Sequence, residues 1–374
     1  NTSYGGTPAN TIIDAQSLGR IFDNTGGHDL TIVSLALRNA NVGGGGIAEY
    51  GGAIYSNGGT VTISSSTLTD CSATGGGAIG IWSGTLIITT STIARCSATN
   101  GPGGAVIIQD SSASITSSTI TDCTASDGGG AFFSSGSPLT IGSTTFSDCR
   151  AMVGGAINAE GGTFTINPAT RFSGCTASKY GGAIYTNSNT GINSATFSEC
   201  SSGSGGAIYY HDSGDPGTAL TITGSTFASI DGVTKDGGAI YNDEDTVSIT
   251  SSTFSGYRAQ NGGAIFNEAG TVTVAGSAFT DCAAEYGGAI FNNGDLDISD
   301  TTFLGCSATG HGGAIASMFN HDITVDSSVF SDCWASGAGG AIRGLSGSTL
   351  TITSTSFTGC RAPVGGAIHF NHVD

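Results

Sequence analysis

The tetrapeptide Gly-Gly-Ala-Ile returns with small variations along the whole chain, at almost constant distances. Its alanines are Ala53, Ala78, Ala105, Ala131, Ala156, Ala183, Ala207, Ala239, Ala264, Ala289, Ala314, Ala341 and Ala367. Successive alanines are 24–27 residues apart, except for one step of 32 residues between Ala207 and Ala239. Self-similarity at such a period is typical of solenoids, in which each repeat packs only against its neighbours.

The order of segments within a repeat indicates strands. A segment Ala-Ile-Tyr or Ala-Ile-Phe is followed by a polar turn, by an alternating segment such as TVTI (60–63), and by Ser-Thr-Phe. Apolar residues alternate with a period of two, and the 63 glycines among 374 residues disfavour helix. Three short strands per repeat predict an all-β parallel β-helix of about fourteen coils. We expect one domain over 1–374, with degenerate first coils over 1–50 and regular repeats over 51–374.

Two positions of the repeat accept only apolar residues and are therefore predicted to face the core. The first is the Ile after Gly-Gly-Ala. The second is a Phe row that is replaced only by Leu or Ile: Phe146, Phe172, Phe197, Phe227, Phe254, Phe279, Phe303, Phe330 and Phe357. The paired glycines are expected where φ is positive, or where a Cβ atom would collide with the neighbouring coil.

All cysteines occupy one place in the repeat, three residues after the Phe position. They are Cys71, Cys96, Cys123, Cys149, Cys175, Cys200, Cys282, Cys306, Cys333 and Cys360. Because Ile230 and Tyr257 take this place in two repeats, we expect an inward, structural row. No closely spaced cysteine pair suggests a metal site, and no metal or cofactor is expected. Disulfides between adjacent coils and a stack of buried free thiols both remain open, the second fitting the parallel geometry better.

Charge limits the class of partner. The formal net charge is −18, with 28 acidic and 10 basic residues, so a surface that binds nucleic acid is excluded. No apolar run approaches the roughly 20 residues that span a bilayer. Because the sequence begins at Asn1 and stops within a repeat, we expect a processed chain or a piece of a longer one.

Three features are candidates for function. An aromatic row follows Gly-Gly-Ala-Ile in five successive repeats and is predicted to be exposed, either binding sugars or a protein or simply stabilising the sheet: Tyr185, Tyr209, Tyr241, Phe266 and Phe291. The longest insertion, 209–217, carries His211, Asp212 and Asp215, which are suited to acid–base catalysis but also to a solvated loop.

The third feature is an acidic row directly before the cysteines. It contains Asp70, Asp122, Asp148, Glu199, Asp281 and Asp332. The row is either a surface that captures Ca²⁺ through carboxylate oxygens or a series of turn residues. Glycines interrupt it at 174, 256, 305 and 359, which favours the turn interpretation.

The motifs Gly154-Gly155-Ala156-Ile157 and Phe146-Ser147-Asp148-Cys149 resemble the GGA(I/L/V) and F-x-x-N repeats of polymorphic membrane proteins, chlamydial surface adhesins, with Cys in place of Asn. The chain also resembles other surface proteins with right-handed β-helix repeats. The resemblance covers nearly the whole chain and implies a right-handed β-helix with an extracellular, adhesive or structural role.

We therefore expect a non-catalytic protein of a cell-surface layer, appendage or fibre. Its partners would be other subunits, further repeats of the same chain or surface glycans, because no cap is evident at either end of the repeat array. The alternative is a polysaccharide-cleaving lyase or hydrolase of the pectate lyase-like β-helix class, with His211, Asp212 and Asp215 as its site.

Overall fold

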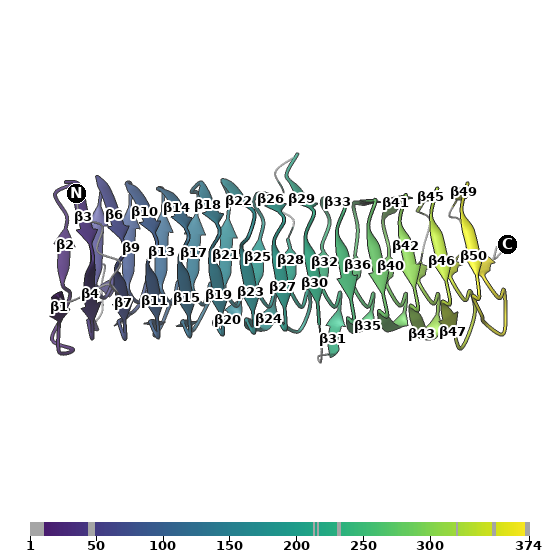
Figure 1. The fold of residues 1–374 in the computed structure, drawn as a ribbon, viewed down its shortest axis with the longest axis horizontal. Helices are drawn as coiled ribbons and strands as arrows, with labels where there is room; N and C mark the ends of the chain where they lie inside the picture. Colours follow the sequence, from purple (N-terminus) through teal and green to yellow (C-terminus); the bar gives the residue numbers. More distant parts are fainter. Residues whose placement is uncertain are drawn as a thin grey trace, which may run out of the picture. The chain divides into compact units, whose positions relative to one another are not determined.

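The computed structural model describes residues 11–43, 49–211, 214, 217–229, 233–318, 321–345 and 349–370. They form a right-handed parallel β-solenoid of about 13 turns, close to the fourteen coils expected from the repeats (Figure 1). Within these ranges the regular structure consists of strands, with no α-helix, and hence no helix able to cross a membrane. The predicted fold class is confirmed.

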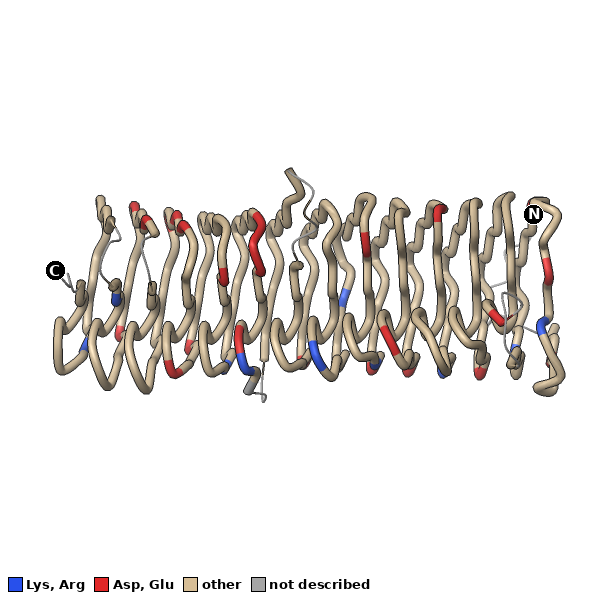
Figure 2. The backbone as a smooth tube through the Cα atoms, turned by 180° about the vertical axis from the view of Figure 1, so that it is seen from behind, with Lys and Arg blue, Asp and Glu red and all other residues tan. Residues whose placement is uncertain are grey.

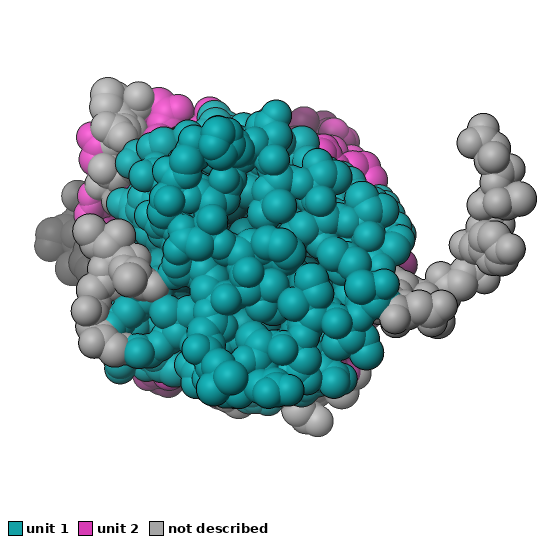
Figure 3. Space-filling model, turned by 90° about the vertical axis from the view of Figure 1, so that its left-hand side faces the viewer, with its two compact units in different colours: residues 1–165 teal, residues 166–374 magenta. Residues whose placement is uncertain are grey.

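The chain divides into two compact units, unit 1 (Asn1–Thr165) and unit 2 (Ile166–Asp374), shown in different colours in Figure 3. The expectation of one domain over 1–374 stays a prediction.

Each unit contains four parallel sheets, and the first, the Ile sheet, is formed by the strands after Gly-Gly-Ala. In unit 1 these are β2 (Phe22–Asn24), β5 (Ile54–Asn57), β9 (Ile79–Trp82), β13 (Val106–Gln109), β17 (Phe132–Ser135) and β21 (Ile157–Glu160). In unit 2 they are β25 (Ile184–Thr186), β28 (Ile208–Tyr210), β32 (Ile240–Asn242), β36 (Ile265–Asn267), β40 (Ile290–Asn292), β44 (Ile315–Ser317), β48 (Ile342–Gly344) and β51 (Ile368–Phe370).

The alternating segments form the second sheet, the Thr sheet. Its unit 1 strands are β3 (Leu30–Val33), β6 (Thr60–Ser64), β10 (Thr85–Thr89), β14 (Ser112–Thr116), β18 (Leu139–Gly142) and β22 (Thr163–Ile166), which contains the unit boundary. Its unit 2 strands are β26 (Asn189–Asn193), β29 (Ala219–Thr223), β33 (Thr246–Thr250), β37 (Thr271–Ala275), β41 (Asp295–Ser299), β45 (Ile323–Asp326) and β49 (Leu350–Thr353).

The strands that carry the Phe row form the third sheet, the Phe sheet. Unit 1 contributes β1 (Thr11–Asp14), β4 (Leu35–Arg38), β7 (Thr67–Thr69), β11 (Thr92–Ala94), β15 (Thr119–Thr121) and β19 (Thr145–Ser147). Unit 2 contributes β23 (Arg171–Ser173), β27 (Thr196–Ser198), β30 (Thr226–Ala228), β34 (Thr253–Ser255), β38 (Ala278–Thr280), β42 (Thr302–Leu304), β46 (Val329–Ser331) and β50 (Ser356–Thr358).

A fourth row of short strands, the return sheet, follows the cysteines, so the prediction of three strands per repeat is wrong. In unit 1 it contains β8 (Ser72–Ala73), β12 (Ser97–Ala98), β16 (Thr124–Ala125) and β20 (Arg150–Val153). In unit 2 this row continues with β24 (Thr176–Tyr180), and a separate sheet contains β31 (Val233–Asp236), β35 (Arg258–Asn261), β39 (Ala283–Tyr286), β43 (Ser307–His311) and β47 (Trp334–Ala335). Strands of two residues are too short to show an alternating pattern in the sequence.

Coils stack in register, so equivalent residues form ladders. Thr60 pairs with Thr85, and Ile63 with Ile88. In unit 2 the Phe row is buried from Phe172 to Phe330, and its consecutive rings stack with centroids 4.6–4.9 Å apart. The predicted inward orientation of this row is confirmed.

Two glycine roles explain the Gly-Gly pair. Gly262 has a φ of 61°, a left-handed conformation that side chains with a Cβ rarely adopt. A Cβ on Gly206, by contrast, would overlap the carbonyl oxygen of Gly238 in the next coil. Both expected reasons for the glycines therefore apply, one at each position of the pair.

Polar ladders complete the interior. The backbone N–H of Ser225 donates to Ser252 Oγ at 3.1 Å, and Ser252 Oγ donates to the carbonyl oxygen of Thr250 at 2.9 Å. Buried amides also pair along the stack: Asn242 Nδ2 donates to Asn267 Oδ1, and Asn267 Nδ2 to Asn292 Oδ1, both at 2.7 Å. Such ladders satisfy polar groups that would otherwise be buried without partners.

Candidate functional site

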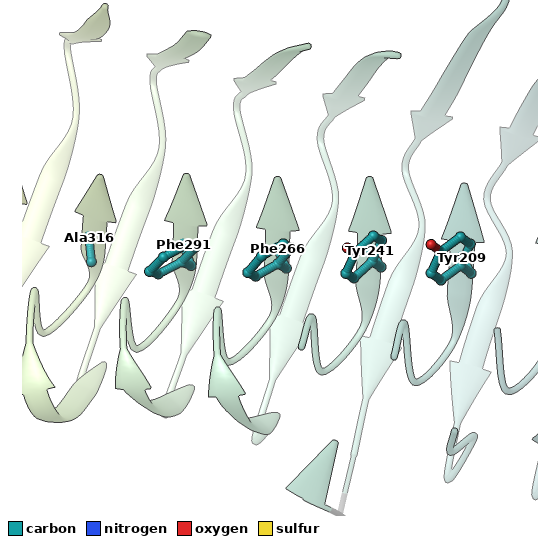
Figure 4. Packing of buried hydrophobic residues seen from close by; sticks show 5 residues of the cluster. All are labelled: Tyr209, Tyr241, Phe266, Phe291 and Ala316. Atoms are coloured by element: carbon teal, nitrogen blue, oxygen red, sulfur yellow. The ribbon is translucent and has the colours of Figure 1, made fainter. Parts of the chain in front are cut away.

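The five aromatic residues that follow Gly-Gly-Ala-Ile lie on β25, β28, β32, β36 and β40 of unit 2. Their consecutive ring centroids are 4.6–5.6 Å apart and the ring planes lie within 16° of each other. Figure 4 shows four of them, Tyr209, Tyr241, Phe266 and Phe291, aligned from coil to coil, with Ala316 next in the row. The residues therefore form the ladder that the repeat predicted.

The expected exposure of this ladder is wrong for four of its five rings. Tyr209, Tyr241, Phe266 and Phe291 are only 6–9% exposed, and Tyr185 is half-buried. Strand alternation places the row on the opposite face from the core isoleucines but does not show what covers that face.

Side chains from other segments cover it. The Tyr180 ring, at the end of β24, lies 4.6 Å from the Tyr209 ring, and Tyr286 and Met318 pack against the same cluster. The segments after the cysteines thus fold over the outer face of the Ile sheet, which removes most of the row from solvent.

Part of the ladder remains open in a groove of about 400 Å³. We call it the tyrosine groove; its lining residues are Lys179, Tyr180, Gly203, Ser204, Tyr209, Lys235, Asp236 and Tyr241. Tyr180 is 40% exposed. Burial, and to a smaller extent the charge of Asp243, raise the pKa of Tyr209, so its hydroxyl stays protonated at neutral pH and is able to donate a hydrogen bond.

Lys179 and Lys235, the two lysines of the sequence, both line the tyrosine groove. Lys235 Nζ lies 3.9 Å from Asp236 Oδ2, and Asp236 Oδ1 accepts a hydrogen bond from Asn261 Nδ2 at 2.7 Å. Elsewhere basic residues are sparse among many acidic ones, as the coloured trace in Figure 2 shows. The lining of the groove thus carries two cations and one carboxylate, on a protein with few basic residues.

Two other hollows are larger than the tyrosine groove. One, of about 620 Å³, is lined by Trp334, Arg361 and Pro363 beside the last described coil. The other, of about 710 Å³, lies at a corner of unit 1 and is lined mainly by Gly, Ser and Thr. It is a shallow polar depression beside the Thr sheet.

The insertion at 209–217 is only partly described. Asp212 and Asp215 lie outside the described residues, so the predicted grouping of His211 with them stays a prediction. His211 Nδ1 lies 2.6 Å from Asp243 Oδ2. The His211 ring lies 5.9 Å from that of Tyr185. Asp243, which was not a candidate from the sequence, is therefore the acidic partner that the structure shows for His211.

The cysteine row is buried. All ten cysteines are free thiols, and only Cys360, in the last coil, is partly exposed. Contact with neighbouring thiols, followed by burial, raises the pKa of Cys71, Cys200 and Cys306. These thiols stay protonated at neutral pH, and a protonated thiol is a poor nucleophile and a poor metal ligand.

The residues of the acidic row before the cysteines adopt a left-handed backbone conformation. Asp70, Asp122, Asp148, Asp281 and Asp332 all have φ between 52° and 56°, and Glu199 shares this conformation with φ 55°. The glycines that replace acids in the row, such as Gly256 with φ 70°, are left-handed too. Asp and Gly tolerate this region better than most residues, which explains why they share the row.

One carboxyl group of this row has a basic partner. Arg95 pairs with Asp70 through two contacts of 2.8 Å and lowers the pKa of that carboxyl group. Across the described ranges, no three His, Cys, Asp or Glu side chains come together in a way that would hold a metal ion.

Four residues beside the aromatic ladder and the insertion were not predicted from the sequence: Lys179, Tyr180, Lys235 and Asp243. The repeat could have shown that Lys179 and Lys235 lie on the same side of the solenoid, because both occur at the same position of their repeats. The covering position of Tyr180 has no sequence signal of its own, since the return sheet was not predicted.

The family model described as right handed beta helix region matches residues 78–254 and 206–373. No curated protein matches the chain.

Proposed function

We propose that this chain, which belongs to the right-handed β-helix family, is a non-catalytic repeat protein of a cell surface, where it forms part of a layer, appendage or fibre and binds neighbouring molecules along its faces. The chlamydial-type GGAI and FxxC motifs, Cys replacing the Asn of that family, support this role. Further subunits, further repeats and surface glycans are the partners that we infer.

The observation that carries the proposal is the repetition of one hydroxyl-bearing position on the outer face of the Phe sheet. In unit 1 Thr67, Thr92, Thr119 and Thr145 occupy it, and each is at least partly exposed. Unit 2 repeats the pattern with Thr196, Thr226, Thr253 and Thr302. Arg171, Ala278 and Val329 interrupt the row in unit 2. Similar weak contacts at the eight threonine positions still add up through multivalency, which suits adhesion or assembly rather than one reaction centre.

The rival function is cleavage of a polysaccharide, which other β-helix proteins perform. The observation in its favour is the pair formed by His211 and Asp243. The His211 side chain is 43% exposed, and the Asp243 side chain is 20% exposed. Acid–base cleavage of a glycosidic bond needs two groups positioned on either side of that bond. One solvent-facing pair beside the insertion is weaker support than a surface repeated over both units.

The test combines binding and turnover. The purified chain is incubated with a panel of immobilised neutral and acidic polysaccharides, and bound protein, new reducing ends and unsaturated products are measured together. We expect retention on at least one polysaccharide without products, and labelling of the protein on intact cells. Product formation that disappears in His211→Ala, with folding unchanged, would show that the chain is an enzyme.

A further inference from the structure

We propose that the outer face of the Thr sheet binds ice, through hydroxyl and methyl groups that lie on a regular grid in unit 1. The ligand is solid water at the surface of an ice crystal. This inference goes beyond the proposed function and does not depend on it, because it concerns a different sheet from the threonine row of the Phe sheet. No bond is made or broken in the protein; the interaction is one of binding.

The grid is formed by three neighbouring strands of unit 1, β6, β10 and β14, which Figure 1 shows side by side. In each strand three outward residues are partly exposed, and the two residues between them are buried. Pairing in register places the outward residues of one strand beside those of the next. We call the outward positions the hydroxyl grid: Thr60, Thr62, Ser64, Thr85, Ile87, Thr89, Ser112, Ser114 and Thr116. Every position of this grid except Ile87 carries a hydroxyl group.

The middle column of the hydroxyl grid continues into the coils on either side. Thr31 of β3 pairs with Thr62, and Thr140 of β18 pairs with Ser114. Both added residues are at least partly exposed. The column therefore runs from β3 to β18 with one interruption, at Ile87.

The intervals of the hydroxyl grid follow from the geometry of a parallel sheet. Outward residues of neighbouring coils are about 4.8 Å apart, and outward residues two positions apart on one strand are about 6.6 Å apart. The prism faces of hexagonal ice repeat their oxygen atoms on a rectangular net with similar intervals in both directions. Thr85 Oγ1 lies 3.1 Å from Ser112 Oγ, so hydroxyls of one column point to the same side. Several hydroxyls can thus hold lattice waters at the same time.

The side chains of the hydroxyl grid are ordered before a ligand arrives. Threonine is branched at Cβ and therefore stiff at χ1. The backbone of β10 is fixed by parallel pairing with β6 on one side and with β14 on the other. Binding then orders few groups that were mobile, and weak contacts at many positions add up. Such a face suits a ligand that is itself rigid and periodic.

A second observation is that charge is absent from these strands. No residue of β6, β10, β14, β18 or β22 is charged, although the chain has 28 acidic residues. Taking a charged group out of liquid water is costly, so a face that meets an uncharged lattice excludes such groups. The hollow of about 710 Å³ borders the first column, where Thr60, Thr85 and Ser112 line it. Its lining includes one acidic residue, Asp110, which lies in the turn before β14.

Unit 2 has a smaller face of the same kind on β29, β33 and β37. Its middle column contains Thr221, Ser248 and Thr273. The next strand, β41, places the exposed side chains of Asp295 and Asp297 on this face. The two carboxylates therefore mark where the uncharged surface of unit 2 ends.

The test grows ice slowly from a solution of the purified chain and compares the protein content of the ice with that of the remaining liquid. Serum albumin is the reference. We expect wild type to enter the ice while albumin stays in the liquid, and single ice crystals to grow with flat facets in its presence. Ser114→Lys places a charge in the middle column and should lower the protein content of the ice about twofold or more. Ser114→Lys combined with Ser248→Lys should abolish entry into ice.

Asp297→Lys is the matched control, because it introduces the same side chain at an outward position of the same sheet where a charge is already present. It should leave the protein content of the ice unchanged. Thermal unfolding verifies that each variant is folded. The inference is wrong if wild type stays in the liquid as albumin does, if the double variant enters ice as well as wild type, or if Asp297→Lys also abolishes entry.

Failure of the ice-binding face and failure of the adhesive function give different results. All variants keep the threonine row of the Phe sheet, so their retention on an immobilised polysaccharide should equal that of wild type. If wild type stays out of ice but is retained on the polysaccharide, the ice-binding assignment is wrong and the adhesive function stands.

Discussion

The Sγ atom of Cys306 lies 3.7 Å from the carbonyl oxygen of Phe279 in the preceding coil. Cys282 makes the same contact with Phe254 at 3.8 Å, and Cys333 with Phe303 at 3.7 Å. Each thiol thus points inward and links its own coil to the strand below. The cysteine row and the Phe row form one continuous structural feature, which makes the thiols part of the core.

Free, buried thiols should be unreactive in the native state. In Ellman's assay we expect slow modification of Cys360, the partly exposed thiol, and modification of the other nine only in denaturant. A total of ten reactive thiols after unfolding without reductant supports the free state. A smaller total would reveal disulfides between coils.

The same burial predicts a pH dependence of stability. Neighbouring thiols and burial raise the pKa of Cys71, Cys200 and Cys306 above the usual value of 9.0. Above about pH 8.5 the unfolded chain loses these protons while the native chain keeps them, so the free energy of unfolding falls as pH rises. Urea midpoints between pH 7 and 10 should decrease, and less steeply in Cys306→Val. A midpoint that rises over this range would contradict the assignment.

The close approach of coils at the second glycine predicts a strong effect of a single methyl group. Gly206→Ala places a Cβ against the carbonyl oxygen of Gly238 and should lower the free energy of unfolding by about 2–4 kcal/mol. Gly191→Ala is the control, because a Cβ there has no neighbour within 4 Å; its effect should stay within about 0.5 kcal/mol. Equal unfolding midpoints for the two variants would refute the packing argument.

The left-handed row before the cysteines predicts which substitutions are tolerated. Asp281 has a φ of 52°. Asp281→Gly should change the free energy of unfolding by less than about 0.5 kcal/mol, whereas Asp281→Val should lower it by about 1–2 kcal/mol because of its branched Cβ. If this position serves mainly through its charge, both variants will instead lose stability to a similar extent.

The buried amide ladder predicts a cooperative loss. Asn267→Ala removes both 2.7 Å amide contacts, with Asn242 and with Asn292, and leaves two buried polar groups without these partners. Thermal or urea unfolding should show a loss of about 2–4 kcal/mol. Thr273→Ala, on the outer side of β37, should lose less than about 1 kcal/mol. A loss for Asn267→Ala as small as that of Thr273→Ala would show that the ladder contributes little.

The coils could be predicted from the repeat because packing restricts which residues can occupy each row. Phe254 and Cys282 lie in rows that accept only apolar residues, and Gly206 lies where only glycine fits. These constraints recur from coil to coil, so the same packing requirement can be seen many times in one sequence. The short strands of the return sheet, such as Ser97–Ala98, have no pattern of their own and were missed.

The candidate site was less predictable because it depends on contacts between different rows. Strand alternation placed Tyr209 on the outer face of the Ile sheet but gave no sign that Tyr180 covers it at 4.6 Å. The pairing of His211 with Asp243 joins two separate coils around an insertion, where the repeat register is lost. The repeat period predicts which residues stack in one row. It does not predict contacts between different rows, because these depend on the backbone conformation of the turns.

The central claim is that the protein holds a polysaccharide without cleaving it. The chain length of the bound polymer tests this claim most directly. An acidic polysaccharide that the protein retains is incubated with it for several days and then analysed by size-exclusion chromatography with light scattering. We predict an unchanged molar mass distribution and full recovery of the bound protein. A progressive shift to shorter chains that requires His211 would contradict the account.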